Sequence, residues 1–190
     1  MTAVFEELAR VSFDLVSINR IVKNAGISRG SFYQYFPDKD DMLEFVMSSY
    51  LIALHDKARK VLRQSGGDIF AVLRRMLSFT IEYGIAEVNR DFCRNIFLHI
   101  SRGDMNALKP LRIDAQRYIQ EFIAYADLSS FRDRSDQALT LAADMLGALL
   151  RGAVVRAFMD IDSAKEVQED FDRILEFAKY GLLAGKDSNG

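Results

Sequence analysis

The chain has 190 residues, 49% of them hydrophobic and 27% charged, which is enough apolar material for a sizeable core in a soluble protein. One cysteine excludes an internal disulfide, and two histidines leave little for metal or nucleophilic catalysis. No apolar run approaches the roughly 20 residues of a membrane helix, and the N-terminus lacks the pattern of a signal peptide. We therefore expect a cytoplasmic protein with no membrane association, no cofactor and no metal.

Two prolines in the whole chain favour long helices, and no window alternates as a strand would. The spacing of apolar residues and the capping residues predict helices over 3–11, 18–24, 28–35, 38–64, 68–87, 89–101, 104–126, 134–159 and 163–184. Ser163, with Glu166 three residues later, predicts a capping box for the last helix. The tail after residue 184 is expected to be frayed.

Residues 17–39 carry the most specific pattern. Two short helices flank a turn at Gly26, and Ser17 and Ser28 are positioned to cap them. We expect one small core built from Ile18, Ile21, Val22, Ile27, Phe32 and Phe36. The second helix then has a polar outer face, as expected of a recognition helix that enters the major groove of DNA.

Charge supports this interpretation locally. The net charge of the chain is −2, which is unfavourable for contact with phosphates. Between Ser17 and Lys39, however, there are four cations and one anion, a local charge of +3. A small basic head on an acidic body is consistent with a DNA-binding protein.

The segment from Ala25 to Phe36, followed by Lys39 and Leu43, closely resembles the helix-turn-helix of the TetR family of transcriptional regulators. The detailed resemblance covers about residues 12–45. It implies an all-α fold: a three-helix DNA-binding domain over 1–45, then a larger helical domain over 46–190 for effector binding and dimerisation. It also implies a regulator, expected to be a repressor, that a small and largely apolar effector releases from a palindromic operator.

Carried over position by position, the resemblance assigns two sets of DNA contacts. The residues expected to face base edges are Arg29, Gly30, Ser31 and Gln34. The residues expected to hold phosphates are Ser17, Ser28, Tyr33, Tyr35 and Lys39. The alternatives are that the tyrosines pack the head and that Lys39 is a solvated lysine. Family members usually have more residues before the first helix, so a missing N-terminal arm would lower DNA affinity.

The remaining chain supplies candidates for a dimer interface and an effector pocket. Small and apolar residues on the last two helices suggest a four-helix interface through Leu146, Gly147, Leu150, Val154, Phe171, Ile174, Leu175 and Ala178. The alternative is that these stripes pack only within one subunit. The pocket candidates are Phe79, Tyr83, Arg94, Phe97, His99, Arg102, Tyr118 and Phe122, although aromatic stripes at helical spacing are more often core. Cys93 is expected to be a buried small hydrophobe.

Two rival functions come from other classes. An enzyme is disfavoured because the chain has no nucleophile elbow, P-loop or dinucleotide fingerprint. A helical ligand-binding or protein-interaction dimer, with a head that no longer binds DNA, stays open. The operator sequence, the effector and the direction of regulation are not determined by these patterns.

Overall fold

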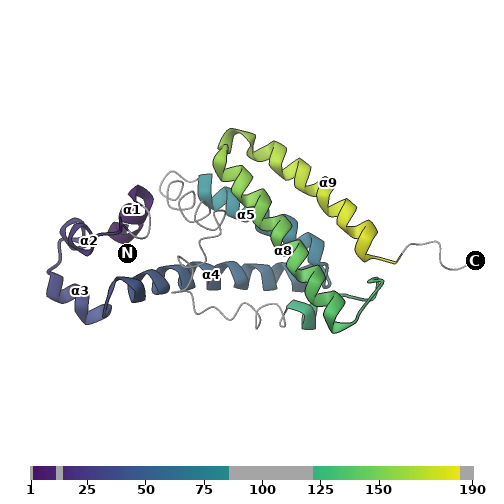
Figure 1. Ribbon diagram of the computed structural model, residues 1–190, viewed down its shortest axis with the longest axis horizontal. Helices are drawn as coiled ribbons and strands as arrows, with labels where there is room; N and C mark the ends of the chain where they lie inside the picture. Colours follow the sequence, from purple (N-terminus) through teal and green to yellow (C-terminus); the bar gives the residue numbers. More distant parts are fainter. Residues whose placement is uncertain (1, 12–14, 86–121, 185–190) are drawn as a thin grey trace, which may run out of the picture. The chain divides into compact units, whose positions relative to one another are not determined.

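The structure is a computed structural model that describes residues 2–11, 15–85 and 122–184. The described helices are α1 (Thr2–Arg10), α2 (Ile18–Ala25), α3 (Arg29–Tyr35), α4 (Lys39–Gln64), α5 (Ile69–Ile85), α8 (Asp136–Met159) and α9 (Ala164–Leu182), with a 3₁₀ turn at Ile161–Ser163 (Figure 1). Among the described residues, extended pairing is limited to one isolated bridge between Phe131 and Leu183. The predicted all-α class is confirmed.

The chain divides into two compact units. One contains residues 1–52 and 81–113, and the other contains residues 53–80 and 114–190. The predicted helix over 89–101 and most of the one over 104–126 lie outside the described residues. The domain boundary after residue 45 stays a prediction.

The first unit is built on a buried carboxylate. Glu7 of α1 is 1% exposed, and its Oε1 accepts hydrogen bonds from the backbone N–H of Ser17 at 3.0 Å and from Nε of Arg20 at 2.9 Å. Its Oε2 is buried and has no hydrogen-bond partner among the described residues. Because Ser17 caps α2, the Oε1 atom fixes both the start of α2 and its first turn against α1.

Around this pair, the apolar core of the unit comes from α1 to α4. The buried apolar side chains are Ala3, Val4, Leu8, Val16, Ile21, Val22, Phe32, Met42, Leu43 and Val46. The expectation for Ile27 was wrong, because its side chain is 44% exposed. Its backbone N–H closes the end of α2 on the carbonyl of Val22, which leaves the side chain at the surface of the turn.

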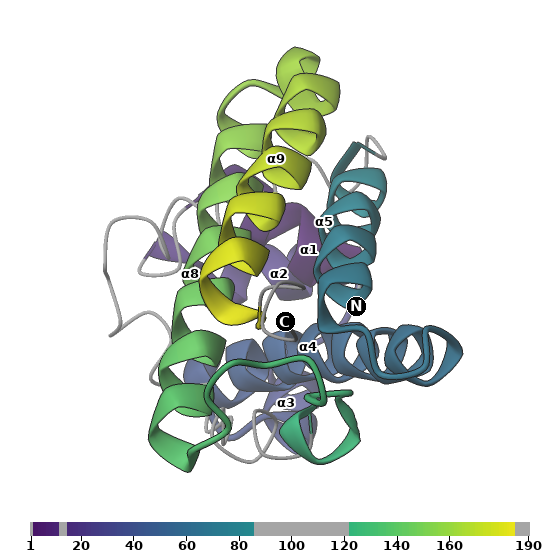
Figure 2. The ribbon, with the colours of Figure 1, turned by 90° about the vertical axis from the view of Figure 1, so that its right-hand side faces the viewer.

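In the second unit, α8 and α9 lie side by side (Figure 2). Phe171 and Leu175 of α9 are fully buried, as are Leu146 and Val154 of α8 to within a few per cent. Arg156 also pairs with Asp170 at 3.0 Å. The helix pair is therefore joined by apolar contact along its inner faces and by an ion pair at its edge.

The capping box predicted for α9 is wrong. Ser163 makes no side-chain capping bond to α9, and its hydroxyl instead donates to the carbonyl of Asp160 at 2.8 Å. The 3₁₀ turn that precedes α9 gives Ser163 backbone angles of φ −87° and ψ 5° instead of the extended conformation that an N-cap residue needs.

The loop before α8 ties together segments that are far apart in the sequence. The N–H of Asp127 donates to the carbonyl of Gly67 at 2.9 Å, and a Cβ at position 67 would lie 2.4 Å from that nitrogen. Arg132 donates through Nη2 to the carbonyls of Tyr180 and Leu183, where α9 ends. Hydrogen bonds from Ser129 hold the pKa of Asp127 below its usual range, so this stabilisation is lost only as the pH falls through that lowered pKa.

The Glu7–Arg20 pair gives a prediction about stability. Replacing Arg20 by Ala leaves a buried carboxylate without its cation, and should lower the free energy of unfolding by about 2–3 kcal/mol. This loss is at or below the usual cost of breaking a buried ion pair, because Arg20 is itself half exposed. Glu7→Leu removes the charge as well and should cost about 1 kcal/mol, for the lost acceptor of Ser17 N–H. Denaturant unfolding of the full chain, followed by circular dichroism, measures both values.

In the double variant Glu7→Leu/Arg20→Ala, the loss should not exceed that of Glu7→Leu alone, because no carboxylate remains to be neutralised. Losses that simply add in the double variant would contradict the coupling of these two residues.

Candidate nucleic-acid interface

The turn between α2 and α3 is set by Gly26. Its φ of 67° lies in the left-handed region, where a side chain would be strained. Gly26 N–H donates to Lys23 O at 3.3 Å and Ile27 N–H to Val22 O at 3.0 Å. These two bonds end α2 in the manner of a glycine-terminated helix and fix the angle at which α3 leaves it.

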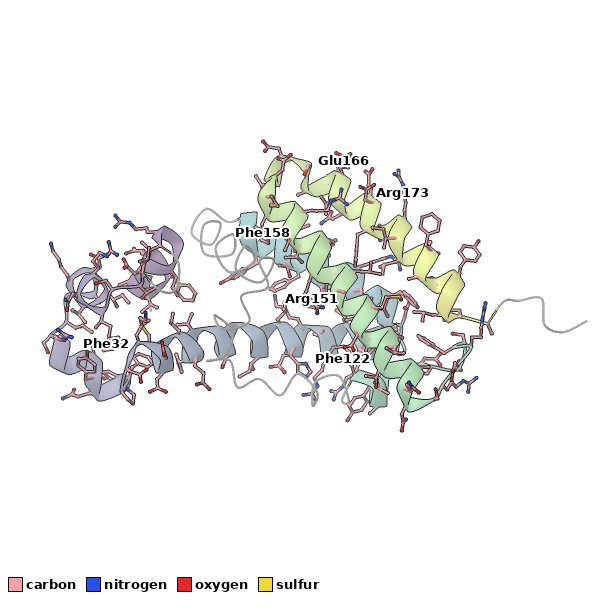
Figure 3. The ribbon with its side chains drawn as sticks, in the orientation of Figure 1. Phe32, Phe122, Arg151, Phe158, Glu166 and Arg173 are labelled. Carbon is pink, nitrogen blue, oxygen red and sulfur yellow. The ribbon has the colours of Figure 1, made fainter. Side chains whose placement is uncertain are left out.

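Ser28 starts α3 as predicted. Its Oγ accepts from the N–H of Ser31 at 3.0 Å and lies 2.9 Å from the Ser31 hydroxyl. Inward, α3 is anchored by Phe32, which is 3% exposed (Figure 3) and whose ring lies 5.6 Å from that of Phe36. The capping bond and this aromatic anchor together determine which side of α3 faces outward.

The outward side of α3 carries the residues that the sequence assigned to DNA. Arg29, Gly30, Tyr33, Gln34 and Tyr35 are exposed, Tyr35 by 78%, and Ser31 is half-buried. The packing alternative therefore does not apply to Tyr35 in this structure. Tyr33 is 42% exposed, with its ring edge against Phe32 at a centroid distance of 5.4 Å, so it contributes to both the core and the surface.

Arg29 and Tyr33 form one unit on this surface. Nη2 of Arg29 donates to the hydroxyl of Tyr33 at 3.2 Å, and the guanidinium carbon lies 5.6 Å from the centre of the ring. The pair is one helical turn apart, so α3 itself aligns it. The contact restrains a long side chain before any ligand is bound, which reduces the entropy that binding must overcome.

Gly30 has no structural reason within the described chain to lack a side chain. A Cβ built there would meet only the Ser28 Oγ, at 3.7 Å, which is ordinary van der Waals contact. The backbone is not in the left-handed region. A glycine in the first turn of an exposed helix costs stability, and packing within the described chain does not account for it.

The cations of the segment are not equivalent. Arg20 is held by Glu7, which leaves less of its charge available to a ligand. Lys23 and Arg29 are exposed, and Lys39 opens α4 as a half-buried residue. The local charge counted along the sequence therefore overstates the positive charge that this surface offers.

The effector candidates fall into two groups. Arg94, Phe97, His99, Arg102 and Tyr118 lie outside the described residues. Phe79, Tyr83 and Phe122 are half-buried. Nζ of Lys57 lies 3.2 Å from the ring centre of Phe79, and the ring of His55 lies 5.5 Å from that of Phe122, edge to face. Lys57 and His55 lie on α4, and neither is among the residues predicted for the pocket.

The dimer candidates are mainly inner-face residues. Leu146, Val154, Phe171 and Leu175 are buried within the single chain, whereas Gly147, Leu150, Ile174 and Ala178 are half-buried. The large apolar side chains of α8 and α9 that the chain leaves exposed are Leu141, Met145, Met159, Phe177 and Tyr180. Helical periodicity separates these outer positions from the buried ones, and that was the signal available in the sequence.

Comparison with known proteins gives a consistent assignment. Residues 1–46 match the family model described as bacterial regulatory proteins, tetR family. A search of curated proteins found no match.

Solved structures share the fold over nearly the whole chain. Thermus thermophilus FadR, a TetR family transcriptional repressor in complex with lauroyl-CoA, is 21% identical with a TM-score of 0.63, covering 99% of this chain and 95% of that one. NalD of Pseudomonas aeruginosa, the secondary repressor of the MexAB-OprM multidrug efflux pump, is 17% identical with a TM-score of 0.59, covering 97% and 94%. A TetR family regulator from Chloroflexus aurantiacus is 21% identical with a TM-score of 0.54, covering 96% and 91%.

The helix-turn-helix of residues 1–46 is thus that of the tetR family of bacterial regulatory proteins, and the chain has the all-helical fold of TetR transcriptional regulators.

Proposed function

We propose that this protein is a dimeric, sequence-specific DNA-binding regulator, and a repressor that a small, largely apolar effector releases from a palindromic operator. The observation that carries the proposal is the outer face of α3, where a capped and anchored helix presents arginine, glycine, glutamine and tyrosine side by side. Such a face suits the edges of base pairs in a major groove.

Each exposed polar residue of α3 has a distinct role in this proposal. Arg29 makes a bidentate contact with guanine, and Gln34 contacts adenine. Gly30 and Ser31 lie at the start of the helix, where its backbone comes closest to the bases. When DNA is bound, the Arg29 side chain either stays on Tyr33 or leaves it to contact guanine. In both cases the hydroxyl of Tyr33 contacts a phosphate.

Phosphate contacts fix the orientation of the head. Ser17 and Ser28 are at the N-termini of α2 and α3, where free backbone N–H groups favour an anion. Tyr33, Tyr35 and Lys39 complete the set. With few exposed cations in this segment, we expect a shallow dependence of affinity on salt for each head.

Dimerisation follows from the need to bind two half-sites about one DNA turn, roughly 34 Å, or more apart. We propose that the outer faces of α8 and α9 form the interface, with Leu141, Met145 and Met159 on α8 and Phe177 and Tyr180 on α9. Phe177 is 75% and Tyr180 81% exposed, which is costly for aromatic side chains in water. By length and composition, α8 could cross a membrane. Its inner face, however, is already packed on α9, and its outer face carries charges. We therefore assign the outer face to a second copy of the chain.

The effector is the least specified part of the proposal. Aromatic side chains beside Lys57 and His55 suggest a largely apolar molecule with a polar or anionic end. Lauroyl-CoA is a suitable first probe, because a protein of the same fold is known in complex with it. Release of bound operator on adding lauroyl-CoA would support this part; a panel of other apolar acids and drugs extends the test.

The central proposal is tested by selecting bound sequences from random duplex DNA. The wild-type protein should enrich a palindrome, and Arg29→Ala should relax one position in each half-site, with a loss of about 1–3 kcal/mol against the preferred base. Glu82→Ala, an exposed change outside α3, is the control. Failure to enrich any sequence at low salt would overturn DNA recognition by this chain and favour the interaction-dimer alternative.

Replacing Gly30 by Ala separates folding from recognition. The methyl group fits and should stabilise α3 by about 0.5–1 kcal/mol, yet operator affinity should fall about tenfold or more because the backbone can no longer approach the bases. Fluorescence anisotropy with the selected operator and thermal unfolding measure the two effects. Glu82→Ala, an exposed change on α5, should bind operator as the wild type does. Unchanged affinity for Gly30→Ala would show that α3 does not approach DNA closely.

The interface is tested by Phe177→Glu, which places a charge in the middle of the proposed apolar contact. We expect the dimer dissociation constant to rise at least about a hundredfold, since burying an unpaired carboxylate costs several kcal/mol. Sedimentation velocity over a concentration series gives the constant. Tyr125→Glu, at an aromatic residue 57% exposed outside α8 and α9, is the matched control. An unaffected dimer in Phe177→Glu would place the interface elsewhere.

A further inference from the structure

The outer face of α8 combines an apolar row with two charges. Leu141, Met145, Ala148, Gly152 and Met159 recur at helical spacing and are all exposed. Asp144 and Arg151 precede Met145 and Gly152 by one residue, so both lie along the same edge of this row, away from Arg156, which pairs with α9. The row is thus bordered on one side by an acid and a base about two turns apart.

Neither charge is used within the described part of the chain. Asp144 and Arg151 are exposed and have no ion pair or hydrogen bond with the described residues. Arg151 lies near the middle of α8 (Figure 3). Its Nη1 lies 3.2 Å from the position that a Cβ at Gly147 would occupy. Arg156, on the opposite edge of the row, is already paired with Asp170 of α9.

Asp144 and Arg151 are equally far, along α8, from the midpoint between Gly147 and Ala148. Asp144 lies three residues before Gly147, and Arg151 lies three residues after Ala148. In a symmetric contact between two copies, residue i meets residue j of the partner while j meets i. If two α8 helices cross antiparallel with the two-fold axis beside Gly147–Ala148, each Asp144 comes opposite an Arg151.

We propose that the second copy binds in this arrangement, so that Asp144 pairs with Arg151 of the partner subunit twice across the two-fold axis. This rests on the dimer face proposed above and adds its register and direction. The same axis places the small Ala148 side chain next to the partner's Ala148 at the crossing point, so the two helices can approach closely there.

The ion pairs serve specificity more than affinity. They lie at the edge of an apolar contact, where exposed pairs add little to binding. In a parallel arrangement about a two-fold axis, the charged edges of the two helices would lie on opposite sides of the contact, so these ion pairs form only in the antiparallel one. A fixed α8 crossing is what sets the separation of the two DNA-binding heads, so the register matters for operator spacing.

Charge reversal tests the pairing. Asp144→Arg would set two Arg–Arg contacts in its homodimer, and Arg151→Asp would set two Asp–Asp contacts. Each variant alone should dimerise at least about tenfold more weakly than the wild type. An equimolar mixture of the two single variants should form the heterodimer. Both of its contacts join unlike charges, whereas neither homodimer has such a contact. The double variant Asp144→Arg/Arg151→Asp should dimerise as the wild type does.

Sedimentation equilibrium and native mass spectrometry measure these species at low salt, with circular dichroism to verify that each variant is folded. Raising the salt concentration should reduce the differences. Single variants that dimerise like the wild type, or a mixture with no preference for the heterodimer, would overturn the pairing. If Phe177→Glu dissociates the dimer in the same experiments, the interface stands and only the register is wrong; if Phe177→Glu has no effect either, the proposed interface fails with it.

Discussion

Glu7 brings a carboxylate into the interior of a small helical unit, where an unpaired charge would be prohibitive. One of its oxygens accepts both the N–H that opens α2 and the guanidinium of Arg20, so α1 and α2 have one favourable arrangement. The turn at Gly26 and the cap at Ser28 extend that arrangement to α3. The outer face of α3 therefore depends on a residue that lies outside α3 and is itself buried.

This dependence separates residues that orient the recognition helix from residues that contact a ligand. Arg20 would be counted among DNA-binding cations by its position, yet its charge is directed inward. Gly30 is the converse case, since nothing in the described chain requires it. Arg29 occupies an intermediate position: it is free to contact a base, but it is already aligned by Tyr33. Preorganisation of this kind favours specific binding over loose electrostatic attraction.

The apolar residues of α8 and α9 fall into an inner, buried set and an outer, exposed set. The inner residues hold the pair together within one chain, and the outer ones remain exposed. In the proposed dimer, Asp144 and Arg151 beside the outer row fix the direction in which the second copy binds. Such a dimer would link a local property of α8 to the separation of its two heads, which the proposed operator requires and the proposed effector would change.

The sequence alone determined the helical class, the caps of α2 and α3 and the exposed polar face of α3, because these depend on residues within one or two turns of each other. Ser28, Gly26 and the exposed tyrosines could be assigned from spacing alone. Two predictions were wrong, the burial of Ile27 and the cap at Ser163. The backbone of a turn leaves the Ile27 side chain at the surface, and the backbone of a 3₁₀ segment gives Ser163 angles that an N-cap residue does not adopt. Only the tertiary structure paired Glu7 with Arg20 and distinguished buried Phe171 from exposed Phe177, since burial is decided by which neighbouring helix covers each face.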